Sequence, residues 1–125
     1  EHVVLAGAVP HHALVETYRG ADIFCLPSVE EGFGMVVLEA MASGLPVVVS
    51  DQVGARDAIS GEAGIVVPVA DVDALAEALR TIVEDPQKRR EMGERARQAA
   101  VGGANGWEDY VDRLWPAYLA LAGGA

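Results

Sequence analysis

Two carboxylates on either side of a glycine-rich turn are the residues of this chain whose types and spacing could do chemistry. Seven residues separate Glu31 from Glu39, and the turn Gly32-Phe33-Gly34 leads from the first carboxylate into an apolar stretch. Glycines on both sides of a bulky aromatic residue cost stability unless the backbone must approach another group closely. The pattern therefore predicts a helix that begins near Gly34 and holds a ligand at its start.

The start of such a helix is a favourable place for an anion. The N–H groups of Phe33, Gly34 and Met35 would have no acceptor within the helix and would lie at the positive end of its dipole. Glu39 would lie about 1.5 turns, or about 7.5 Å, further along, with its side chain tilted back toward the same end. Glu31 would lie on the loop just before. Phosphates at the helix end and hydroxyls at the two carboxylates would suit a sugar nucleotide.

A simpler interpretation is an ordinary surface turn followed by a solvated glutamate. For a short glycine-rich turn alone, that interpretation would suffice. The neighbours of Glu39 in residues 35–42 are almost all apolar, however, and a carboxylate without a partner is expensive to bury in such a helix. This cost favours the functional interpretation.

Short apolar runs alternate with helical patterns along the chain and predict the elements that would position this site. We expect strands at His2–Gly7, Asp22–Pro27, Pro46–Ser50 and Gly64–Pro68. We expect helices from Pro10 or His11 through Tyr18, from Gly34 to a left-handed end at Gly44, over Gly54–Ile59, after an N-cap at Asp71, over Gln87–Ala100, and from Trp107 or Glu108 onward with a bend at Pro116. Nearly continuous apolar strands between helices indicate an α/β fold, a parallel sheet with helices on both faces.

Two of these helices have a predicted buried face. In the helix after Asp71 the apolar positions that share one face are Val72, Leu75, Leu79, Ile82 and Val83. In the charged helix over Gln87–Ala100 the apolar stripe is narrow and consists of Met92 and Ala96.

The order of motifs resembles a known family, the retaining family-4 glycosyltransferases of GT-B fold. The spacing of Glu31 and Glu39 is similar to the E-x7-E motif of that group. Further matching segments follow in the family's order over almost the whole chain: residues 4–9, 18–23, 26–28, 31–34, 38–42, 44–48, 53–54 and 64–67. The resemblance implies a partial doubly wound, Rossmann-like sheet of the GT-B C-terminal domain type, with extra C-terminal helices.

The resemblance also implies roles for individual residues in sugar transfer from a nucleotide diphosphate sugar, with retention and without a metal or other cofactor. Glu39 would bind the ribose hydroxyls, and Glu31, the candidate catalytic residue, would face the hydroxyls of the transferred sugar. Backbone N–H groups from Phe33 to Val36 would bind phosphate or sugar oxygens. The implied donor-binding residues are Gly7, Val9, Glu31, Gly32, Phe33, Gly34, Met35, Val36 and Glu39.

Residues 1–125 would form only part of the family's nucleotide-sugar-binding domain. Two βα units, which carry the Arg and Lys that grip the diphosphate, would precede His2–Gly7, and their strands would lie between the first and second strands here. The acceptor domain would be absent as well. We therefore expect the isolated chain to have no transferase activity, to bind nucleotides weakly or not at all, and to self-associate through open strand edges.

Two other functions stay open from the sequence. A sugar-nucleotide epimerase shares the two-domain architecture, although the E-x7-E spacing counts against it. A non-catalytic nucleotide-sugar-binding module is the third possibility, because the diphosphate-binding Arg and Lys do not occur in this sequence.

Composition excludes several classes of partner. The net charge of −10 with only 9 basic residues argues against nucleic acid and against electrostatic attachment to anionic lipid. We recognise no signal-peptide pattern in these residues and no apolar run of about 18 residues that could span a membrane. We expect a cytoplasmic protein that reaches the inner membrane face only through the absent N-terminal domain.

Three further motifs have structural interpretations that we prefer. Asp71-Val72-Asp73 matches a metal-binding Asp-x-Asp signature, but an N-cap followed by a first-turn acid explains it better. The pair His11-His12 would point to different faces of a helix start, which does not suit a metal. Cys25 lies within an apolar run and is predicted to be a small buried hydrophobic residue.

Overall fold

The computed structural model describes residues 2–59, 62–102, 116 and 120. Within them the chain forms α1 (His11–Arg19), β1 (Phe24–Leu26), α2 (Met35–Ala42), β2 (Val47–Ser50), the 3₁₀ helix η1 (Gly54–Ala58), β3 (Gly64–Val67), α3 (Val72–Val83) and α4 (Pro86–Gly102). The three strands form a parallel sheet in the order β1-β2-β3. The alternation of strands and helices confirms the predicted α/β, Rossmann-like fold.

The central strand β2 explains why helices cover both faces of the sheet. Val47, Val48 and Val49 are all fully buried, and their side chains alternate between the two faces. Val47 and Val49 pack with α2 and η1, whereas Val48 packs with Ile82 of α3. A strand that is apolar at every position is the expected centre of such a sheet.

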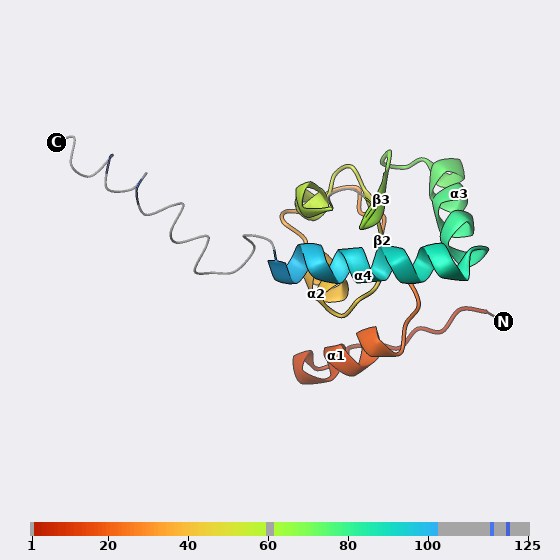
Figure 1. The fold of residues 1–125 in the computed structure, drawn as a ribbon, viewed down its shortest axis with the longest axis horizontal. Coiled ribbons are helices and arrows are strands. Elements are labelled where there is room, and N and C mark those ends of the chain that lie inside the picture. The colour runs from red at the N-terminus through yellow and green to blue at the C-terminus, as the bar shows by residue number, and fades with distance from the viewer. Residues whose placement is uncertain (1, 60–61, 103–115, 117–119, 121–125) are drawn as a thin grey trace.

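Helix α4 belongs to both cores. Its Ala96 is part of the core that contains α2, and its Met92, one turn earlier, is part of the core that contains α3. Figure 1 shows α4 crossing in front of the sheet, with α3 standing at one end and α1 lying apart below. The predicted stripe of Met92 and Ala96 is confirmed, with Gly93 buried between them.

The predicted strand over His2–Gly7 is wrong. The segment 2–10 forms no regular element, and Val3, Val4 and Leu5 are 78%, 88% and 93% exposed. A strand needs a neighbour for its backbone N–H and C=O groups. Within the described residues no strand lies beside this segment, and Figure 1 shows it leading away from the body.

Two predictions of burial need correction for a related reason. Cys25 is exposed rather than buried, because β1 is an edge strand of the described sheet. On α3, Val72 and Val83 are 75% and 57% exposed, because the buried stripe runs through Leu75, Ala78, Leu79 and Ile82 instead.

The ends of several helices agree with their sequence signals. Gly44 has φ +85°, the left-handed conformation predicted after α2. The Asp71 side chain accepts a hydrogen bond from Ala74 N at 2.8 Å, which confirms the N-cap of α3. The helix predicted from Trp107 or Glu108 lies almost entirely outside the described residues. None of the described helices combines the length and apolar character that crossing a bilayer requires.

Substitution of Gly93 tests the packing of α4 on the turn after α2. A Cβ at Gly93 would lie 2.3 Å from the Gly44 carbonyl oxygen. Because backbone cannot yield as a flexible side chain does, we expect Gly93→Ala to lower the free energy of unfolding by about 1–3 kcal/mol. Gly102→Ala is the matched control, since a Cβ there meets nothing within 4 Å. Urea unfolding measures both variants, and equal stabilities would contradict the close packing.

Candidate functional site

The first turn of α2 begins as the glycine-rich turn predicts. Gly34 precedes Met35 with φ +80° and ψ 55°, a left-handed conformation that glycine adopts without strain, and no side chain caps the helix. The N–H groups of Phe33, Gly34, Met35 and Val36 have no hydrogen-bond acceptor among the described residues. The helix start therefore presents free donors at the positive end of the α2 dipole.

The loop before α2 is held by the last residue of β2 and by the segment that follows this strand. Ser50 Oγ donates to the Ser28 carbonyl at 2.5 Å. Gly54 N donates to the Gly32 carbonyl at 3.1 Å, and Ala55 N donates to the Phe33 carbonyl at 2.6 Å. These three bonds have loop carbonyls as their acceptors and fix the shape of the loop. The loop N–H groups remain free and can donate hydrogen bonds to an anion.

Close packing adds to these bonds at Gly34. A Cβ at this position would lie 2.9 Å from Val53 Cγ1, and the Gly34 backbone is buried. A larger residue would force either the Val53 side chain or the loop to shift, and it would be strained at this positive φ.

Glu31 lies beside the helix start. Its side chain is half-buried, and a Cβ built at Gly34 would come within 3.5 Å of Glu31 Cγ. Gly32, Phe33 and Met35 are exposed around it, Phe33 and Met35 each to 51%. One carboxylate and a row of free N–H groups thus share one surface.

Glu39 has a partner that the sequence did not indicate. The hydroxyl of Tyr18 in α1 donates to Glu39 Oε2 at 3.0 Å, across 21 positions of the chain. Tyr18 is 8% exposed, and its ring meets Phe24 edge to face at 6.0 Å. Burial, together with the hydrogen bond to Glu39 and the charge of that carboxylate, raises the pKa of Tyr18 to about 12. The neutral phenol is therefore the form that faces Glu39.

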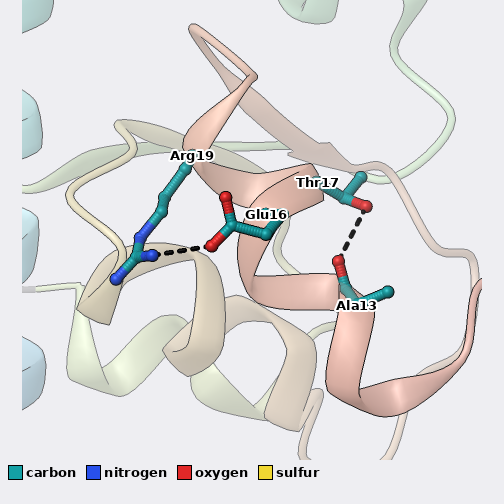
Figure 2. Close-up of polar contacts among 4 residues, drawn as sticks. All are labelled: Ala13, Glu16, Thr17 and Arg19. Carbon is teal, nitrogen blue, oxygen red and sulfur yellow. Dashed lines mark hydrogen bonds and ion pairs between the residues drawn. The ribbon is translucent and has the colours of Figure 1, made fainter.

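The other polar contacts of α1 lie on its exposed surface. Thr17 donates to the Ala13 carbonyl at 3.2 Å, and Arg19 forms an ion pair with Glu16 at 2.7 Å. Figure 2 shows both contacts joining residues of α1 to one another. Tyr18 consequently joins α1 to the body, whereas Thr17 and Arg19 on either side of it do not.

The remaining predicted residues lie in the segment before α1. Gly7 is exposed with φ +72°, and Val9 is half-buried. That these two residues and the two carboxylates converge on one ligand stays a prediction. Tyr18 and Ser50 were not predicted from the sequence as site residues. Tyr18 and Gly54 lie in segments that match the family, but no role was predicted for either.

A small cavity lies at the same edge of the sheet, beyond the carboxyl ends of the strands. Its volume is about 190 Å³, and the residues that line it include Pro27, Ser50 and Pro68. Ligands of open α/β sheets bind at this edge. The Ser50 that holds the loop before α2 also lines this cavity.

Comparison with known proteins adds independent information. Residues 1–99 match the family model of glycosyl transferases group 1. The chain is 43% identical over 111 residues to a D-inositol 3-phosphate glycosyltransferase of Kribbella flavida, covering 88% of the chain and 26% of the relative. It is 35% identical over 121 residues to a GDP-mannose-dependent monoacylated alpha-(1-6)-phosphatidylinositol monomannoside mannosyltransferase of Corynebacterium glutamicum, covering 91% and 32%.

A solved structure agrees with these relatives. Sucrose-phosphate synthase from Thermosynechococcus elongatus superimposes with a TM-score of 0.81 at 32% identity, covering 96% of this chain and 30% of that chain. The chain thus spans about a quarter to a third of the length of the proteins it matches. The transferases and the synthase among these proteins count against the sugar-nucleotide epimerase that the sequence left open.

Alkaline stability tests the environment of Tyr18. The pKa of Tyr18 is raised from 10.0 to about 12 in the folded state, so the neutral phenol stabilises the fold. This stabilisation is fully present below pH 10 and is lost as the pH rises toward 12. We expect wild type to lose more stability than Tyr18→Phe over that interval, so that the difference between them narrows. Urea midpoints from pH 7 to 11.5 measure it, and parallel losses in the two proteins would contradict the assignment.

Proposed function

The chain belongs to the glycosyl transferases group 1 family, and from that premise we propose that it forms the donor-binding part of a retaining, metal-independent glycosyltransferase whose donor is a nucleoside diphosphate sugar. The observation that carries this proposal is the start of α2. It combines free N–H donors, a left-handed glycine and a carboxylate beside them. An anionic, hydroxyl-bearing ligand fits that combination.

The phosphates of the donor would accept hydrogen bonds from the N–H groups at residues 33–36. These donors are already fixed by the hydrogen bonds that join the loop to the end of β2 and to the segment after it. Fixed donors stabilise charge that develops on a leaving diphosphate without having to reorganise. Catalysis by this part of the protein would then be largely electrostatic.

The two carboxylates would divide the polar recognition of the donor. Glu39 accepts hydrogen bonds from ribose hydroxyls, and Glu31, nearer the helix start, accepts them from the transferred sugar. Carboxylates suit both tasks because each has two oxygens and only accepts hydrogen bonds when ionised. Glu31 lies at the end of a glycine-rich loop, a place that suits orientation of the sugar better than nucleophilic attack.

The names of the relatives suggest which nucleotide the donor carries and which kind of acceptor receives the sugar. One relative depends on GDP-mannose, and another acts on D-inositol 3-phosphate. We therefore propose that the nucleotide is a nucleoside diphosphate such as GDP or UDP and that the acceptor is a polyol, free or attached to lipid.

Variants that remove one carboxylate at a time test the division of roles in the full-length protein. We expect Glu39→Ala to weaken GDP or UDP binding about tenfold or more, because hydrogen bonds to a charged group are lost. We expect Glu31→Gln chiefly to lower kcat. Calorimetry and release of nucleoside diphosphate in the presence of an acceptor measure these effects. Glu30→Gln is the matched control, an exposed neighbour of Glu31 that should behave as wild type. Unchanged binding and turnover in both site variants would refute the roles.

A further inference from the structure

The Glu39 carboxylate is held in place by a residue of another helix. The Tyr18 hydroxyl donates to its Oε2 at 3.0 Å, and this is the one side-chain hydrogen bond to the Glu39 carboxylate within the described residues. Ser43 bonds to the Glu39 main-chain carbonyl and leaves the carboxylate alone. No ion pair among the described residues includes Glu39.

The neighbours of Glu39 on α2 offer no other way to fix it. Val37, Leu38, Ala40 and Met41 are all buried in the core and provide no side-chain donor. A half-exposed glutamate on such a helix would otherwise sample several rotamers, and ordering it on binding would cost conformational entropy. Tyr18 removes this freedom before a ligand arrives.

Tyr18 is itself well fixed. It is buried, packs edge to face on Phe24, and forms the α1 contribution to the core together with Leu14. A rigid donor that occupies Oε2 leaves Oε1 with both of its lone pairs for a ligand. The pair therefore has the features of a preorganised acceptor and not only those of a link between two helices.

We propose that Tyr18 is a positioning residue that orients the Glu39 carboxylate toward the ribose hydroxyls of the nucleoside diphosphate. This inference rests on the proposed function, and it names the residue through which α1 controls recognition of the ribose. Tyr18 touches no reacting atom. Its effect is on the affinity for ribose-bearing ligands.

A double-mutant cycle tests the proposal in the full-length protein. Calorimetric titrations with GDP, UDP and their 2′-deoxy counterparts are carried out on wild type, Tyr18→Phe, Glu39→Ala and the double variant. We expect Tyr18→Phe to weaken binding of the ribonucleotide about three- to tenfold and binding of the deoxynucleotide less. The double variant should bind as Glu39→Ala does, within about twofold, because Tyr18 acts through Glu39.

Thr17→Val is the matched control. It removes a hydroxyl from the same helix one residue away, where the hydroxyl bonds only within α1. Its nucleotide affinities should equal those of wild type. Thermal unfolding of every variant separates a positioning role from loss of fold.

The outcomes together distinguish failure of this inference from failure of the proposed function. Wild type that binds none of the nucleotides overturns both. Wild-type binding that Glu39→Ala leaves unchanged contradicts the proposed role of Glu39 and the inference with it. Binding that weakens in Glu39→Ala but not in Tyr18→Phe overturns the inference alone, as does a purely additive cycle with equal losses for ribo- and deoxynucleotides. A lower melting temperature with unchanged affinities would show that Tyr18 only joins the helices.

Discussion

The candidate site depends on hydrogen bonds that join the loop before α2 to the end of β2 and to the segment after it. Ser50, Gly54 and Ala55 donate to three carbonyls of the loop, so the carbonyls are satisfied inside the molecule and the N–H groups at the start of α2 stay free. A loop of this composition would otherwise have many conformations, given its glycines. Because parallel strands end at one edge of the sheet, the pairing of β1 with β2 brings the two segments together.

Local signals predicted much of this arrangement. Gly34, the apolar residues after it and Gly44 define the bounds of α2, and Asp71 defines the start of α3, because each depends on backbone conformation within a few residues. The three consecutive valines of β2 predicted a strand, and a strand that is apolar at every position is typical of a sheet covered on both faces.

Features that depend on distant partners could not be predicted in the same way. The apolar pattern of His2–Gly7 is typical of a strand, but a strand exists only beside another, and the described residues provide none. The apolar neighbours of Cys25 in the sequence indicate burial, but Cys25 is exposed because β1 lies at an edge of the described sheet. The bond from Tyr18 to Glu39 depends on how α1 packs against the body, which neither helix encodes by itself.

The membership of α4 in both cores has a consequence for how the molecule opens. Met92 and Ala96 are one turn apart and contribute to opposite faces of the sheet, so the loss of α4 would open the packing of both faces together. The two faces should accordingly exchange their amide hydrogens with solvent as a single cooperative unit. Helix α1, joined to the body through Leu14 and Tyr18, should exchange earlier and separately. Tyr18, which we propose to orient Glu39, would then lie on the least protected helix, whereas Glu39 itself lies on α2 within the cooperative unit.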